Sequence, residues 1–96
     1  MPKIEIAYAG LIRTLVRSSE EHWDMPSGST VGQLLEEVVR RHGPATRPHL
    51  LNGTAALPPH VLVSVDGVAC RDLATPLDGK EARVRILVMS PMMVGG

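Results

Sequence analysis

Aromatic side chains are almost missing from this chain of 96 residues. It has one tyrosine, Tyr8, one tryptophan, Trp23, and no phenylalanine. Apolar residues still make up 44% of the sequence, so the core must be built mainly from Val, Leu and Ile. Proteins that stack on single-stranded nucleic acid need aromatic platforms, and this sequence does not provide them.

An excess of charge of one sign is also lacking. Ten basic residues balance ten acidic ones, and no basic stripe or polybasic cluster favours nucleic acid or a membrane surface as a partner. No hydrophobic run reaches membrane-spanning length, and no signal-peptide pattern is present. The composition therefore predicts a neutral, single-domain, cytoplasmic protein that binds neither nucleic acid nor membranes.

Cysteine occurs once, as Cys70, which excludes an internal disulfide framework. We expect this thiol to be a small buried or half-buried residue without a redox role. The four histidines share no metal-ligand spacing, so the sequence predicts no metal site. They are His22, His42, His49 and His60.

Alternation of apolar and polar residues predicts the strands. The first two runs form an opening hairpin, in which residues 11–18 supply the turn. Asp66-Gly67 is a strong signal for a second tight turn, and residues 75–79 for a third. The predicted strands are residues 3–9, 20–25, 61–65, 68–71 and 82–89.

One helix is strongly indicated after residue 30. Thr30 and Gln33 match a capping box, in which each side chain satisfies a backbone amide of the first turn. The apolar residues that follow have helical spacing and form one stripe. The stripe contains Val31, Leu34, Leu35, Val38, Val39 and, at its end, His42.

The opposite face of this helix is charged. Glu36 precedes Arg40 by four residues and Glu37 precedes Arg41 by four, which is the favourable order for helical ion pairs. Gly43-Pro44 then ends the helix.

The connection that follows, residues 43–60, contains four prolines and is predicted as a loop. Leu50 and Leu51 are expected to pin it to the core in a short helical turn. The element order is then β-β-α-β-β-β. Because one amphipathic helix must cover one face of the sheet, we expect an α+β fold with a mixed sheet of four to five strands.

The chain ends on "SPMMVGG", and here the whole sequence resembles the ubiquitin-like sulfur carriers. This family includes the small subunit of molybdopterin synthase and the thiamine-pathway carrier. The resemblance rests on the first strand, on "GSTVGQLLEEV", "VLVSVDGV" and "TPLDGKEARVRIL", and on the final "GG". It implies the β-grasp fold for residues 1–90 and a flexible tail for residues 91–96.

The resemblance also implies a function for the tail. In this family the terminal glycine, here Gly96, is adenylated by a ubiquitin-activating-type adenylyltransferase and converted to a thiocarboxylate. The carrier binds no cofactor, because ATP is used by the activating enzyme. The other implied partners are a sulfur donor enzyme and a downstream synthase large subunit or sulfur-inserting enzyme. The carrier itself is then a co-substrate and not an enzyme.

The residue types of the tail suit such chemistry. Glycines without Cβ atoms can enter a narrow channel, and proline stiffens the root of the tail. Methionine and valine can bind apolar grooves, and methionine adapts to more than one groove. The expected partner-binding residues are Pro91, Met92, Met93, Val94 and Gly95.

Two alternatives remain open at this point. The same ending would suit a protein modifier joined to target lysines through Gly96. A β-grasp interaction module without any tail chemistry is the third reading. The pathway that would receive the sulfur, whether for molybdopterin, thiamine, cysteine or another metabolite, is not specified by these residues.

Overall fold

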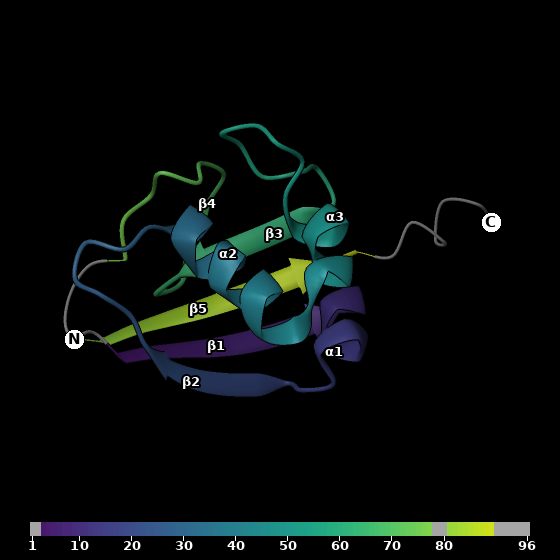
Figure 1. Ribbon diagram of the computed structural model, residues 1–96. Coiled ribbons are helices and arrows are strands. Elements are labelled where there is room, and N and C mark those ends of the chain that lie inside the picture. Colours follow the sequence, from purple (N-terminus) through teal and green to yellow (C-terminus); the bar gives the residue numbers. More distant parts are fainter. Residues whose placement is uncertain (1–2, 78–80, 90–96) are drawn as a thin grey trace.

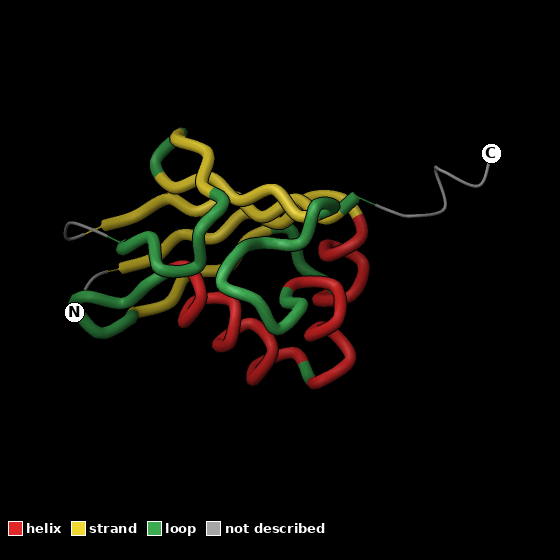
Figure 2. The backbone as a smooth tube through the Cα atoms, turned by 90° about the horizontal axis from the view of Figure 1, so that it is seen from above, coloured by secondary structure: helices red, strands yellow, loops and turns green. Residues whose placement is uncertain are grey.

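The computed structural model describes residues 3–77 and 81–89. Five strands form one sheet, and the helices pack together against one of its faces (Figures 1 and 2). The expected α+β architecture is confirmed. In chain order the elements are β1 (Lys3–Gly10), α1 (Leu11–Val16), β2 (Glu20–Asp24), α2 (Val31–His42), η1 (Pro44–Thr46), α3 (Arg47–Leu50), β3 (Val61–Val65), β4 (Val68–Cys70) and β5 (Glu81–Val88).

The sheet is mixed, with the strand order β2-β1-β5-β3-β4. Its centre is a parallel pair, β1 and β5, whose register runs from Lys3 opposite Glu81 to Gly10 opposite Val88. The other three pairs, β1 with β2, β5 with β3 and β3 with β4, are antiparallel. The last strand of the chain is therefore held between two neighbours.

The core lies between this sheet and α2. The predicted stripe of α2 is buried except for His42 at its end, which is partly exposed. The inward residues of β1, β3 and β5 are also buried, apart from Val65, which is only partly buried. The expected packing of α2 on the sheet is confirmed. The fully buried side chains include Ile4, Ile6, Leu34, Leu35, Val38, Val84 and Ile86.

The capping box of α2 is present as predicted. Thr30 Oγ1 accepts a hydrogen bond from the Gln33 amide at 3.2 Å, and the Thr30 amide donates to Gln33 Oε1 at 2.8 Å. At the other end, the Gly43 amide donates to the Val39 carbonyl. Both ends of α2 are thus defined by local residues.

One of the two predicted ion pairs on α2 is wrong. Glu37 pairs with Arg41 as expected, but it also forms an ion pair with Arg40. Glu36 pairs instead with Arg47, at 2.6 Å, and this hydrogen bond lowers the pKa of the Glu36 carboxyl. The chain turns back after α2 and brings Arg47 alongside, which spacing within the helix could not indicate.

The prediction that residues 11–18 form only a turn is also wrong. Most of this segment is the helix α1. Ile12 and Val16 lie one turn apart, and both are buried, so a short apolar face holds the helix against the sheet. Arg17 ends the helix in a left-handed conformation, with φ 57°.

The proline-containing connection is helical where it crosses the core. η1 and α3 follow α2, with Leu50 buried and Leu51 partly buried. The expected short helical turn is confirmed. No helix in the described part of the chain has the length and hydrophobicity needed to cross a bilayer.

Candidate functional site

The end of β5 is the point from which the predicted tail starts. On one side, Val88 lies opposite Gly10 of β1. On the other side, the Met89 amide donates a hydrogen bond to the His60 carbonyl at 2.9 Å. Both neighbours therefore hold the chain up to Met89.

The predicted site residues themselves lie outside the described residues. This applies to the proposed reactive residue and to the partner-binding segment, so the flexibility expected for the tail stays a prediction. These residues are Pro91, Met92, Met93, Val94, Gly95 and Gly96.

Gly10 allows the close approach of β1 to the end of β5. Its φ is +73°, and a Cβ at this position would lie closer than 3.0 Å to the Val88 carbonyl oxygen. Real Cβ atoms essentially never approach other atoms so closely. Sequence reasoning did not identify this role. The signal was present, because Gly10 directly follows the alternating residues of the first strand.

Hydrophobic side chains gather where β5 ends. Leu62 lies opposite Leu87 on the sheet face that carries no helix, and Met89 follows Leu87 by two residues. Leu62 and Met89 are each 45% exposed, which is unusual for large apolar side chains in this protein. We call Leu62, Leu87 and Met89 the tail-root patch.

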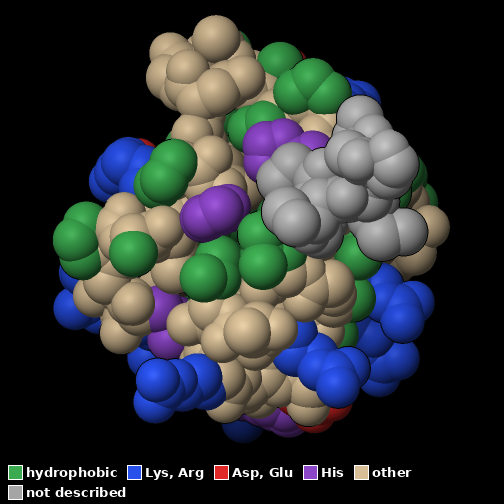
Figure 3. Space-filling model, turned by 90° about the vertical axis from the view of Figure 1, so that its right-hand side faces the viewer, with side chains coloured by type: hydrophobic (Ala, Val, Ile, Leu, Met, Phe, Trp, Pro, Cys, Tyr) green, Lys and Arg blue, Asp and Glu red, His purple; other side chains and the backbone are tan. Residues whose placement is uncertain are grey.

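The surroundings of the patch carry positive charge. Figure 3 views this end of the molecule and shows hydrophobic and His side chains on it, Lys and Arg side chains toward the periphery, and very little Asp or Glu. Along the outer side of β5, Arg83 and Arg85 precede Leu87 and are exposed, as predicted. A partner with an apolar centre and an acidic rim would complement this end of the molecule.

A polar cluster supports the strands behind this end. The Tyr8 hydroxyl donates to Glu21 Oε1 at 2.7 Å, and His42 Nε2 lies 2.9 Å from the same oxygen. Burial, together with the Glu21 carboxylate, raises the pKa of Tyr8 far above its usual value, so the phenol stays a donor. This cluster joins β1, β2 and α2, and its phenol is buried.

Cys70 is half-buried on β4, as expected. Burial raises the pKa of its thiol, partly offset by a hydrogen bond with Thr75. A raised pKa means less thiolate at neutral pH and therefore lower reactivity. Cys70 thus lacks the environment of a reactive cysteine.

These features define a β-grasp, ubiquitin-like fold, in which β5 lies in the centre of the sheet. The resemblance inferred from the sequence is confirmed at the level of the fold by solved structures. The chain is similar to small archaeal modifier protein 1 of Haloferax volcanii, with a TM-score of 0.77 and 19% identity over 93% of this chain and 97% of that one.

Two further structures are similar over nearly the whole chain. A putative molybdopterin converting factor, subunit 1, from Pyrococcus furiosus has a TM-score of 0.75 and 21% identity, covering 94% of this chain and 100% of that one. A chain of the Amycolatopsis orientalis BexX/CysO complex has a TM-score of 0.68 and 17% identity, covering 91% and 96%. At these identities the likeness shows the fold.

No protein-family model matches the sequence, and the search of curated proteins finds no match either.

Proposed function

We propose that this protein is a ubiquitin-like sulfur carrier that works through the carboxylate of Gly96. The observation that carries the proposal is the end of β5. There β5, which is hydrogen-bonded on both sides, ends at the exposed tail-root patch. In the sequence it is followed by an apolar segment that finishes on Gly-Gly. The similarity to a putative molybdopterin converting factor subunit and to a chain of the BexX/CysO complex supports it.

The proposed chemistry has two steps. An activating enzyme joins the Gly96 carboxylate to the α-phosphorus of ATP, which releases pyrophosphate and forms an acyl-adenylate. A sulfide anion then attacks the acyl carbon and displaces AMP, leaving a glycyl thiocarboxylate. The activation is needed because a carboxylate is ionised at neutral pH and is a poor electrophile.

The carrier needs no catalytic side chain in this scheme. Covalent catalysis normally requires a base beside the nucleophile, and the partner enzymes would supply it. The described residues offer what a carrier needs, namely a fixed origin for the tail and an apolar surface beside it. In a downstream synthase, docking of the same surface would place the thiocarboxylate in a second active site.

Mass spectrometry of the intact protein tests the proposal directly. The protein is incubated with the activating enzyme of the same organism, ATP and sulfide. Replacement of one oxygen by sulfur should raise the mass by about 16 Da, as a covalent change at the terminal carboxylate. Deletion of Gly96, or addition of one residue after it, should abolish the gain, because displacing a reacting atom by about 1 Å can cost about 100-fold in rate.

Cys70→Ser is the control for sulfur that is added to the cysteine thiol and not to the Gly96 carboxylate. It should leave the mass gain intact, because the sulfur is proposed to sit on the carboxylate. A mass gain that maps to Cys70, or that survives deletion of Gly96, would show that the proposed site is wrong.

The tail-root patch makes a separate, graded prediction. Leu62→Ser should raise the KM of the activating enzyme for this protein about tenfold, since complete burial of a leucine side chain is worth about 1.5 kcal/mol or more. Val68→Ser is the matched control, because Val68 is 69% exposed but lies on β4, away from the end of β5. Equal effects of the two substitutions on KM would show that the tail-root patch is not part of the docking surface.

A protein modifier is the second candidate. It is favoured by the similarity to small archaeal modifier protein 1. Adenylation of Gly96 is shared by both candidates, but the product differs. A sulfur carrier yields a thiocarboxylate, whereas a modifier yields an isopeptide bond between Gly96 and a lysine of another protein. After trypsin digestion that lysine would carry residues 86–96, because Arg85 is the last basic residue of the chain.

A further inference from the structure

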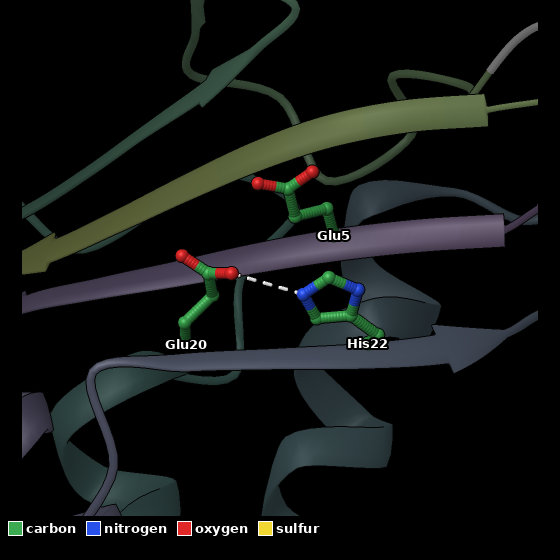
Figure 4. A group of neighbouring side chains, drawn as sticks. All are labelled: Glu5, Glu20 and His22. Atoms are coloured by element: carbon green, nitrogen blue, oxygen red, sulfur yellow. Dashed lines mark hydrogen bonds and ion pairs between the residues drawn. The ribbon is translucent and has the colours of Figure 1, made fainter.

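Three potential metal ligands meet on the sheet face that carries no helix. Glu5 of β1 lies directly opposite His22 of β2, and Glu20 precedes His22 by two residues on the same face. One ligand atom from each side chain lies within 4.8 Å of those of the other two. Figure 4 shows the Glu20 carboxylate directed at the His22 ring and Glu5 on the neighbouring strand.

We propose that Glu5, Glu20 and His22 together bind a divalent transition-metal ion of the zinc type. One imidazole nitrogen and two carboxylate oxygens are donors that such ions accept, and three protein ligands leave a position open for water or for a partner's ligand. The site is independent of the tail chemistry proposed above.

The geometry requires only a small adjustment. Ligands bound at about 2.0–2.2 Å to one tetrahedral ion lie about 3.3 Å apart, so the widest gap must close by at most about 1.5 Å. His22 Nε2 is already 2.9 Å from Glu20 Oε1. Side chains of Glu20 and His22 are 54% and 67% exposed, so rotation about their side-chain bonds can bring the donors together.

The backbone positions under the site are fixed by the sheet. Glu5 lies on a central strand, and its register with His22 is held by the β1–β2 ladder. A change of register by one residue would move these side chains to the core face, so the fold itself keeps them together. This distinguishes the cluster from carboxylates that meet by chance on a mobile loop.

Arg83 competes with the ion. It lies opposite Glu5 on β5, and its Nε is 3.7 Å from Glu5 Oε2. The Arg83 side chain is 77% exposed, and an ion pair this exposed is weak, so a divalent cation can displace it. The positive charge of Arg83 should nevertheless lower the affinity for metal. Removal of this charge should therefore strengthen binding, whereas removal of a ligand should weaken it.

Calorimetric titration of the full chain with Zn²⁺ tests the site. The Cys70→Ser background removes the one thiol, which lies at the opposite edge of the sheet. We expect one ion per chain. His22→Ala should weaken binding at least about tenfold, with comparable losses for Glu5→Gln and Glu20→Gln, since each removes one of three ligands. Arg83→Gln should tighten binding about two- to fivefold, by removing a nearby positive charge.

Two variants control for general effects. His49→Gln removes a histidine elsewhere, and Glu81→Gln removes a carboxylate from the same outer face, so each should change the affinity by less than about twofold. Deletion of Gly96 should leave zinc binding unchanged, so a failure of the carrier proposal does not affect this one. Thermal unfolding of each variant verifies that it is folded.

Two results would overturn the site. The first is binding that His22→Ala leaves unchanged. The second is the absence of heat and of His22 ring shifts in NMR spectra at up to about 1 mM Zn²⁺, a concentration that would reveal even a weak site.

Discussion

Substitution of Gly10 by alanine probes the contact on which the candidate site depends. At φ +73° and ψ −146°, Gly10 occupies a region that is almost reserved for glycine, so alanine there costs about 1–3 kcal/mol. The added Cβ would also enter the space of the Val88 carbonyl oxygen, and such overpacking costs a further 1–3 kcal/mol or so. We therefore expect Gly10→Ala to reduce the free energy of unfolding by about 2–6 kcal/mol.

Gly28→Ala is the matched control. Gly28 also has a positive φ, +83°, but a Cβ there would meet nothing within 4 Å. Its cost should be limited to the backbone term of about 1–3 kcal/mol. Urea unfolding measures both variants, and hydrogen exchange of the Met89 amide reports separately on the end of β5. Equal destabilisation by the two substitutions, with unchanged exchange at Met89, would refute the close-approach argument.

Three further predictions follow from the core and the polar cluster. Leu35→Ala should cost about 2–5 kcal/mol in urea unfolding, since Leu35 of α2 is fully buried against the sheet; an unchanged midpoint would contradict that packing. Because the folded-state pKa of Tyr8 is raised, its stabilising contribution is complete below the ordinary tyrosine pKa near 10 and is lost as the pH rises beyond that value. Tyr8→Phe should therefore flatten the fall in the urea midpoint between about pH 9 and 11, and an equally steep fall in the variant would argue against the assignment. Cys70 should react with iodoacetamide more slowly in the folded protein than in urea, as followed by mass spectrometry, because burial raises its thiol pKa; equal rates would show an open thiol.

Local pattern was sufficient for much of the fold. The stripe and capping box of α2 predicted its bounds to within a residue, because burial of one helical face and satisfaction of the first amides both depend on residues a few positions apart. The strands followed from alternation for the same reason. The short helix α1 was missed, although Ile12 and Val16 have helical spacing, because six residues carry little periodic signal.

The tail shows a different limit of the sequence. The final Gly-Gly drew attention to Gly96, and the resemblance of the whole chain supplied a function for it. The described structure adds how β5 is held up to Met89, the close approach at Gly10 and the exposed side chains of Leu62 and Met89. None of these follows from the tail's own residues.

By itself, the sequence determined the type of most elements and their buried faces, because each depends on neighbouring residues, while the resemblance of the whole chain singled out the candidate reactive end. Only the tertiary structure decided which distant side chains meet. Glu36 pairs with Arg47, and Glu5 faces His22, because chain reversals and strand register bring them together. Register is a property of two strands at once, so one strand's pattern shows which face a side chain occupies but not what lies across from it.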